Sequence, residues 1–270
     1  MTNIFKILII AGSDPSGGAG LQADIKVATA HKVYAGAVVS CLTAQNTQGV
    51  GAVFNPPVSF LRQQLEMVFD DIKFDAIKIG MLSNAEIIDC VANALQARAK
   101  KIPLILDTVM VSTSGHLLLE ENAVEALKSR LCKGAFLVTP NIDEAQVLAQ
   151  MKIKSLDDMQ HAALKIKALG VQNVLIKGGH LPAKNGEIIS ILLDENGKFH
   201  KISNKKINVK KLHGTGCSLA SAIACNIAKK NNLLESVKKA NQYVYKAVLN
   251  NLRIGRGSRV LRHYGGSLPS

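Results

Sequence analysis

The chain has 270 residues, of which 47% are hydrophobic, and this is enough to bury the core of one large α/β domain. The apolar run near its N-terminus, residues 7–11, is too short for a signal peptide, and no run is long enough to span a membrane. The five cysteines contain no CxxC pair, which argues against a zinc site or a disulfide framework and favours a reducing cytoplasm.

The formal net charge of +13 is concentrated in the C-terminal quarter. Residues 196–270 hold fifteen Lys and Arg against one acid, Glu235, whereas residues 1–195 hold eighteen basic and nineteen acidic residues. Such a segment could attract nucleic acid, a membrane surface or phosphorylated small molecules, or it could be an ordinary solvated surface. Its few aromatic residues weaken the nucleic-acid interpretation, because bases stack on aromatic faces.

From the N-terminus, short apolar runs alternate with longer segments of helical periodicity. The runs expected to form strands are residues 6–12, 36–44, 74–80, 102–107, 135–140 and 173–179. The segments expected to form helices are residues 18–31, 58–71, 84–100 and 123–131, with two more beginning at Ile142 and Ser155. Strands that are apolar on both faces and alternate with helices predict a mainly parallel sheet covered by helices.

The alternation of apolar runs and helical segments ends near Glu187. Residues 187–203 form two apolar runs around a turn, which predicts a small antiparallel hairpin. Helices are expected within residues 213–224 and over residues 233–252. No repeat, low-complexity block or linker interrupts the pattern, so we expect a single domain over residues 1–270.

The segment AGSDPSGGAGLQAD, residues 11–24, is a glycine-rich junction between the first strand and the first helix. It lacks the G-K-[ST] ending of a P-loop. A G-x-G-x-x-A pattern begins at Gly18, but no acid occurs between Asp24 and Glu66 to bind a ribose, so a dinucleotide site is the weakest hypothesis. The segment is either a plain turn or a substrate pocket over the helix N-terminus, with Asp24 as a hydrogen-bonding partner.

Three further residues stand where expected strands end, which is where ligands bind in open α/β sheets. Gln45 follows the second strand, Met81 the third and Asp107 the fourth. A carboxylate at Asp107 could hold Mg²⁺ or orient phosphates, or it could cap a turn.

Two more segments leave their alternatives open. In TPNIDEA, Asn141 and Glu144 fit a capping box at a helix start, and they equally fit a phosphate and magnesium site. In IKGGH, Lys177 ends a strand, where it could bind a phosphate or simply be solvated.

The segment HGTGCSLASAIA, residues 213–224, predicts an anion site at a helix start. Its glycines let the backbone approach a ligand, and the free N–H groups of the first turn bind anions. Cys217 falls in that turn, where the helix dipole is expected to lower the pKa of the thiol. The alternative for a lone cysteine on a helix of small residues is simple packing.

Together these segments resemble the hydroxymethylpyrimidine/phosphomethylpyrimidine kinases of thiamine biosynthesis, a family of the ribokinase-like superfamily. The matching segments, spread from about residue 7 to residue 225, are AGSDPSGGAGLQADIK, LTAQNTQGV, IKIGML, LDTVM, TPNIDEA, IKGGH and HGTGCSLASAIA. The resemblance implies a three-layer fold and two successive ATP-dependent phosphorylations, first of 4-amino-5-hydroxymethyl-2-methylpyrimidine and then of its monophosphate. It also implies Mg²⁺ and a homodimer.

The resemblance assigns roles to individual residues. The residues implied in binding the pyrimidine are Gly12, Asp24, Gln45, Met81 and Val109. Those implied at the Mg–ATP phosphates are Asp107, Asn141, Glu144 and Lys177, with Asp107 and Glu144 at the metal. Gly214, Thr215 and Gly216 would form the anion hole for the transferring phosphoryl group, and Cys217 would accept the proton of the substrate hydroxyl.

Two rival functions remain open from the sequence. A pyridoxal kinase of the same fold would carry the same cysteine motif. A nucleic-acid-binding protein would use the basic C-terminal quarter, although such a module has no need of an anion hole. We therefore expect small-molecule partners and ATP, with neither nucleic acid nor membrane as a partner.

Overall fold

The computed structural model describes residues 4–110, 121–179, 181, 186–209 and 211–264. One nine-stranded sheet runs through them in the order β3-β2-β1-β4-β5-β6-β7-β8-β9. The strands are β1 (Lys6–Ser13), β2 (Tyr34–Gln45), β3 (Val50–Phe54), β4 (Ala76–Ile79), β5 (Leu104–Leu106), β6 (Leu137–Val138), β7 (Asn173–Ile176), β8 (Glu187–Leu193) and β9 (Phe199–Lys205). A second sheet pairs β10 (Leu212–His213) with β11 (Arg259–Val260).

The central strands of the large sheet, from β2 to β7 in its order, are parallel. At its edges β3 joins β2, β8 joins β7 and β9 joins β8 in antiparallel pairs. The β8–β9 pair is the hairpin expected over residues 187–203. The prediction of a mainly parallel sheet with a small antiparallel hairpin is confirmed.

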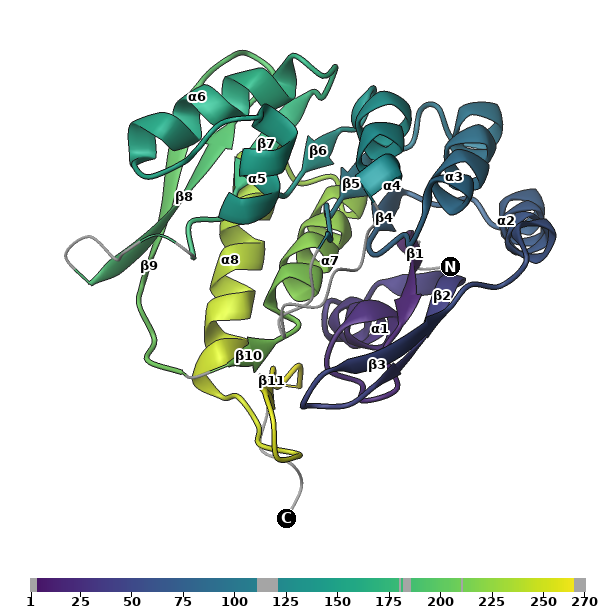
Figure 1. Ribbon diagram of the computed structural model, residues 1–270, viewed down its shortest axis with the longest axis horizontal. Helices are drawn as coiled ribbons and strands as arrows, with labels where there is room; N and C mark the ends of the chain where they lie inside the picture. Colours follow the sequence, from purple (N-terminus) through teal and green to yellow (C-terminus); the bar gives the residue numbers. More distant parts are fainter. Residues whose placement is uncertain (1–3, 111–120, 180, 182–185, 210, 265–270) are drawn as a thin grey trace.

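Helices cover both faces of the sheet (Figure 1). They are α1 (Gly20–Ala30), α2 (Val58–Asp71), α3 (Ala85–Arg98), α4 (Glu121–Ala126), its π-helical continuation η1 (Leu127–Cys132), α5 (Ile142–Ala149), α6 (Leu156–Lys167), α7 (Thr215–Ala228) and α8 (Leu233–Leu249). Successive side chains of β1 point to opposite faces of the sheet, as in any strand, so they pack into two different hydrophobic cores. Leu8 and Ile10 belong to the core under α2–α6, and Ile7 and Ile9 to the core under α1, α7 and α8. The result is the three-layer arrangement expected from the sequence.

Strands β3, β10 and β11 were not expected from the sequence. Strand β3 follows a tight turn in which the side-chain oxygen of Asn46 accepts from the backbone N–H of Gln48 at 2.8 Å. Its run VGAVF is short and weakly alternating, so periodicity could not reveal it. Strands β10 and β11 have two residues each, and their paired residues are 47 positions apart in the sequence, which no local pattern encodes.

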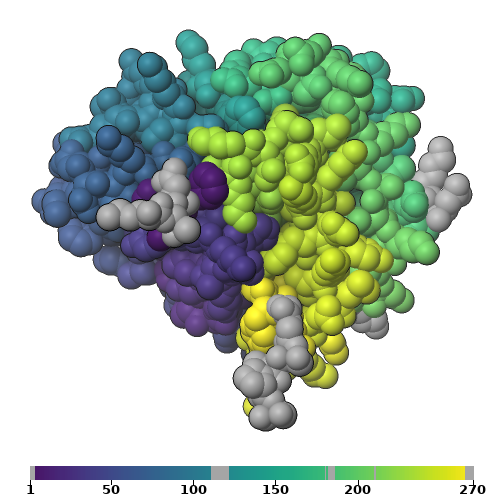
Figure 2. Space-filling view, turned by 180° about the vertical axis from the view of Figure 1, so that it is seen from behind, coloured from purple at the N-terminus to yellow at the C-terminus, as the bar shows by residue number. Residues whose placement is uncertain are grey.

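No helix in the described part of the chain is long and apolar enough to cross a membrane. The N-terminal and C-terminal parts of the chain lie side by side on the face shown in Figure 2, where the purple and yellow regions meet. Helices α1 and α7 pack together there. This contact brings the glycine-rich segment after β1 close to the start of α7.

Candidate active site

A cavity of about 870 Å³ lies at the carboxyl ends of the parallel strands. Of the site residues expected from the sequence, those that line it are Gly12, Gln45, Met81, Asp107, Val109, Asn141, Glu144, Lys177, Gly214, Thr215, Gly216 and Cys217. The structure therefore brings together residues from six strand ends and from the starts of α5 and α7. Asp24 is the exception, because it does not line the cavity.

Asp24 is instead the anchor of a buried ion pair. Its carboxylate lies 2.6 Å from Nζ of Lys78, and both side chains are fully buried. The hydroxyl of Ser221 on α7 donates to the same carboxylate at 2.8 Å. The expectation that Asp24 bonds to a ligand is corrected: it holds Lys78, which is itself part of the cavity wall. Burial is the largest single effect and opposes the charge of Lys78, but Asp24, Cys217 and Asp107 together outweigh it and raise the pKa of the amine.

The start of α7 forms the anion-binding part of the cavity wall. Gly214 caps the helix with φ +85°, and a Cβ there would lie 1.9 Å from the carbonyl oxygen of Gly18. The next residues, Thr215 and Gly216, begin the helix, so their N–H groups have no intrahelical acceptor. A Cβ on Gly216 would lie 3.3 Å from Nζ of Lys177. The helix start therefore offers free N–H groups beside a cation, as an anion requires.

Cys217 lies in the first turn of α7, partly exposed to the cavity. Burial raises the pKa of its thiol to about 11, while the nearby Lys78 ammonium and the backbone N–H of Gly20 act in the opposite direction. The expected lowering of this pKa by the helix dipole is therefore wrong, because desolvation is the larger effect. The thiol is protonated at neutral pH in the ligand-free protein.

A lysine and two carboxylates lie next to the start of α7. Nζ of Lys177 lies 2.9 Å from Asp107 and 4.0 Å from Glu144. Burial raises the pKa of Glu144 to about 7, with Lys177 lowering it and Asp107 raising it. Burial disfavours the charge of Lys177, but Asp107 and Glu144 outweigh it and raise the pKa of the amine.

The capping box and the ligand site predicted for TPNIDEA involve the same atoms. The side chain of Asn141 accepts from the N–H of Glu144 at 2.9 Å, and Glu144 accepts from the N–H of Asn141 at 2.8 Å. Both residues also line the cavity. The capping box thus holds the Glu144 carboxylate beside Lys177, and the two interpretations do not exclude each other.

Gln45 belongs to a polar group whose other two members, Asp14 and His213, were not singled out from the sequence. Nε2 of His213 lies 2.9 Å from the side-chain amide of Gln45 and 3.1 Å from the carboxylate of Asp14. Asp14 also accepts from the N–H groups of Gly18 and Ala19 in the glycine-rich segment. The signal that could have revealed this group is that Asp14 and His213 each flank a glycine-rich helix start.

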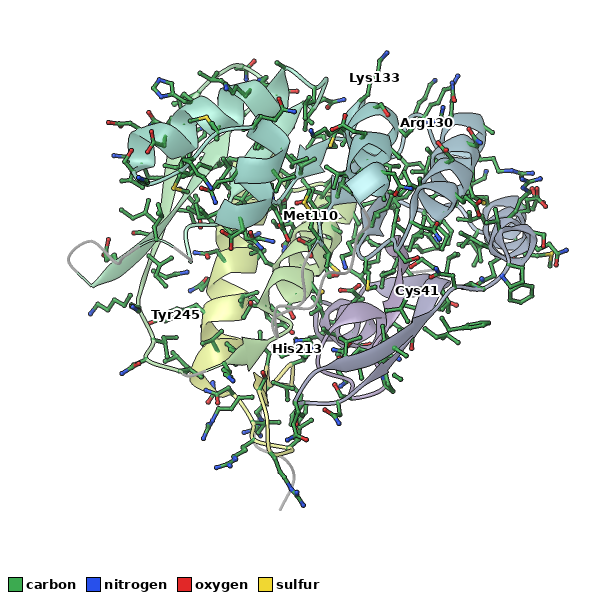
Figure 3. All side chains as sticks on the ribbon, viewed as in Figure 1. Cys41, Met110, Arg130, Lys133, His213 and Tyr245 are labelled. Atoms are coloured by element: carbon green, nitrogen blue, oxygen red, sulfur yellow. The ribbon has the colours of Figure 1, made fainter. Side chains whose placement is uncertain are left out.

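The walls between these polar groups carry sulfur and apolar side chains. A Cβ on Gly12 would lie 2.8 Å from Sγ of Cys41 and 3.4 Å from Sδ of Met81, so Gly12 leaves room for both. Figure 3 labels Met110, which follows β5, His213 in β10 and Tyr245 in α8. All three line the cavity.

The sequence profile of the phosphomethylpyrimidine kinase family matches residues 14–262. A hydroxymethylpyrimidine/phosphomethylpyrimidine kinase of Bacillus subtilis is 40% identical over 97% of this chain and 96% of its own. A thiamine biosynthesis bifunctional protein of Geobacter sulfurreducens is 42% identical over 95% of this chain. This chain spans 52% of that relative's length and 46% of the length of a bifunctional enzyme of Arabidopsis thaliana.

The chain is similar to solved structures of both phosphomethylpyrimidine kinases and pyridoxal kinases. A phosphomethylpyrimidine kinase from Clostridium difficile is 38% identical, with a TM-score of 0.80 over 90% of this chain and 99% of that one. A pyridoxal kinase of Bacillus subtilis in complex with ADP is 31% identical, with a TM-score of 0.87 over 97% of this chain and 98% of that one. The profile match over most of the chain, together with a relative 40% identical along nearly its whole length, shows that this chain belongs to the phosphomethylpyrimidine kinase family.

Proposed function

We propose that this chain phosphorylates 4-amino-5-hydroxymethyl-2-methylpyrimidine and then its monophosphate, with ATP as the phosphoryl donor. The observation that carries the proposal is the start of α7, where free N–H groups, Lys177 and the Cys217 thiol face one cavity. This is the arrangement that phosphoryl transfer needs, since catalysis of this kind rests on positioning and on stabilising charge. The relatives named as pyrimidine kinases support the choice of acceptor.

Each part of the cavity wall has a distinct role in this proposal. The N–H groups of Thr215 and Gly216 would receive the charge of the phosphoryl group in transfer, beside the Lys177 ammonium. Gln45 would hold the pyrimidine edge, because an amide both donates and accepts. Cys217 would take the proton of the substrate hydroxyl, and the Lys78 ammonium would stabilise the thiolate that this requires.

Asp107 and Glu144 fit a magnesium ion. Kinases bind Mg²⁺ through one or two carboxylates, with substrate phosphates and water as the other ligands. No group of three or more His, Cys, Asp or Glu in the described part of the chain could hold a metal, so these two carboxylates would share the ion with the ATP phosphates. When bound, the ion would neutralise part of the negative charge of the ATP phosphates.

A second candidate is a pyridoxal kinase. The observation in its favour is the TM-score of 0.87 to a pyridoxal kinase of Bacillus subtilis, which exceeds the 0.80 to the phosphomethylpyrimidine kinase from Clostridium difficile. Sequence identity favours the pyrimidine kinase, at 38% against 31%. One fold can host several substrates, so sequence identity and the family profile carry more weight here than backbone similarity, and the pyrimidine is preferred.

The proposal is tested by measuring ATP consumption with hydroxymethylpyrimidine, its monophosphate and pyridoxal as acceptors. We expect the largest kcat/KM for hydroxymethylpyrimidine and clear turnover of its monophosphate. Preferential turnover of pyridoxal would favour the second candidate, and turnover of none of the three would refute both.

We also propose that the chain acts as a single domain in the cytoplasm and as a homodimer. One sheet extends from β3 to β9, which supports the first point, and all five cysteines are free, which suits a reducing compartment. The homodimer rests on the family resemblance alone. Sedimentation of the purified protein would test it.

A further inference from the structure

The amide of Gln45 lies between two polar neighbours at the cavity wall. Its Nε2 lies 2.9 Å from Nε2 of His213, and its Oε1 lies 3.3 Å from Oγ1 of Thr43. The two ends of an amide have nearly the same shape, so its hydrogen-bonding partners decide which end faces which neighbour. The protons on His213 and Thr43 therefore determine the orientation of Gln45.

Asp14 requires a proton on Nε2 of His213. Its carboxylate is buried and accepts from Ser16 N–H at 2.8 Å, Ser16 O–H at 2.7 Å and Ala19 N–H at 2.9 Å. An ionised carboxylate can only accept, so a contact of 3.1 Å to Nε2 of His213 is favourable only if that nitrogen carries hydrogen. This holds for the Nε2–H tautomer and for the imidazolium alike.

Thr43 has already used its one proton. Its hydroxyl lies 2.9 Å from the carbonyl oxygen of Ser13, which can only accept. The longer contact to Gln45 therefore meets a lone pair of the hydroxyl. Thr43 can accept from an amide N–H of Gln45 but has no second proton to donate.

We propose that His213 and Thr43 are positioning residues that hold the Gln45 amide with Oε1 toward His213 and Nε2 toward Thr43. A half turn of the amide about its last bond achieves this and turns both contacts into donor–acceptor pairs. The single Nε2–H of His213 is then shared between the Asp14 carboxylate and Oε1 of Gln45, and the amide nitrogen donates to the Thr43 hydroxyl. With the opposite orientation, two donors face each other at His213 and two lone pairs at Thr43.

This orientation fixes the order in which Gln45 presents its acceptor and donor to a ligand. His213 directly precedes Gly214, so the acceptor end lies on the side of the anion hole. In hydroxymethylpyrimidine the amino group, a donor, is next to the reacting hydroxymethyl group, and the ring nitrogen, an acceptor, comes after it. In pyridoxal the corresponding neighbour is an aldehyde, an acceptor. The inference rests on the proposed function and makes the two positioning residues determinants of the preference for the pyrimidine.

A nuclear magnetic resonance experiment on the ligand-free protein tests the orientation directly. We expect Overhauser contacts from the Gln45 amide protons to the Thr43 methyl group, and a nitrogen spectrum in which Nε2 of His213 is protonated. Contacts from those amide protons to the His213 ring, or an unprotonated Nε2, would overturn the proposal whatever the enzyme's substrate.

Kinetics test the consequence for specificity. In His213→Leu and in Thr43→Val the amide can turn, so the kcat/KM ratio of hydroxymethylpyrimidine over pyridoxal should fall about tenfold, mainly through KM for the pyrimidine. His213→Gln keeps an N–H donor and should restore much of the ratio. The matched control is His200→Leu, since His200 also pairs with a carboxylate, Asp194 at 2.8 Å, but does not line the cavity.

A double-mutant cycle separates positioning from a general structural effect. In a Gln45→Ala background, His213→Leu should change the ratio no further, because the amide it orients is gone. An equal fall in both backgrounds would show that His213 does not act through Gln45 and would refute the proposal. Absence of turnover of either compound by the unaltered protein would instead refute the proposed function, and the spectrum would still decide the amide orientation.

Discussion

At Cys217 two physical effects oppose each other. The helix start, the Gly20 N–H and the Lys78 ammonium favour a thiolate, and burial disfavours it and raises the pKa to about 11. The net result could not be predicted from the sequence, because position in a helix can be deduced from a motif but depth below the surface cannot. The thiol belongs to a buried charge cluster, and its acidity is a property of that cluster.

The raised pKa makes a prediction about pH. If Cys217 must be a thiolate to accept the proton, kcat/KM should rise about tenfold per pH unit between pH 7 and 9, below the raised pKa. Cys217→Asp, with a carboxylate ionised at neutral pH, should flatten the profile, and Cys217→Ala should lose about 10²–10⁴-fold of turnover. Nucleotide binding, followed by calorimetry, serves as the control and should be unchanged. A flat profile for the unaltered protein would contradict the role of Cys217 as base.

The buried pair of Asp24 and Lys78 makes a prediction about stability. Asp24→Asn leaves the Lys78 ammonium buried without a counter-charge, and the free energy of unfolding should fall by about 3–5 kcal/mol. Removing both charges in Asp24→Leu/Lys78→Met should cost less than the single change, because no charge is then stranded. Urea unfolding curves of the three proteins measure the difference. A double variant less stable than Asp24→Asn would show that the pair itself is a net source of stability.

At the scale of elements, the start of α7 depends on one backbone conformation. Gly214 has φ +85° and lies against the carbonyl of Gly18, so a side chain there must push α7 away from the glycine-rich segment. We expect Gly214→Ala to lower kcat by about 10²-fold or more, since a misplaced anion hole no longer meets the phosphoryl group. Gly134→Ala is the matched control, because Gly134 has φ +87° and nothing within 4 Å of an added Cβ.

The control variant should keep full activity. Alanine at either position has the same strained backbone angle and should cost about 1–2 kcal/mol of stability. An equal loss of activity in the two variants would mean that backbone strain alone, rather than the close approach to Gly18, explains the effect. Steady-state kinetics and thermal unfolding of both proteins make the comparison.

At the scale of the whole molecule, Gly257 and Ser258 near the C-terminus bind the turn between β2 and β3 through hydrogen bonds. The N–H of Gly257 donates to Oγ1 of Thr47 at 3.1 Å, and the N–H of Ser258 donates to the Thr47 carbonyl at 2.7 Å. A Cβ on Gly257 would lie 1.9 Å from that carbonyl oxygen. Since Gln45 is two residues before Thr47, this contact holds the strand end that carries it.

We expect Gly257→Ala to raise KM for the pyrimidine several-fold and to lower the melting temperature, with kcat less affected. Gly51→Ala in β3 is the control, because its Cβ would meet only the Ala44 carbonyl at 3.4 Å. Steady-state kinetics and thermal unfolding measure both variants. If Gly257→Ala and Gly51→Ala had the same KM and melting temperature, the contact of Gly257 and Ser258 with Thr47 would have no part in ligand binding.

The location of the basic residues of the C-terminal quarter relative to the cavity is also evident only from the whole molecule. Among its described lysines and arginines, Lys205 alone lines the cavity. The net charge therefore lies mostly outside the site, and composition could not show this. The alternation of apolar runs and helices did predict the layers, since burial on both faces of a parallel sheet leaves a pattern in each strand.

The sequence by itself determined the parallel sheet, the hairpin of residues 187–203 and several of the cavity's polar residues, because each follows from a local pattern in a strand, at a strand end or at a helix start. Only the tertiary structure decided that Asp24 pairs with Lys78, that His213 lies between Asp14 and Gln45, and that burial raises the pKa of Cys217. These features depend on which distant segments meet and on how much water they exclude. Desolvation and ion pairing arise from contacts between distant segments, so they cannot be deduced from any single segment of the sequence.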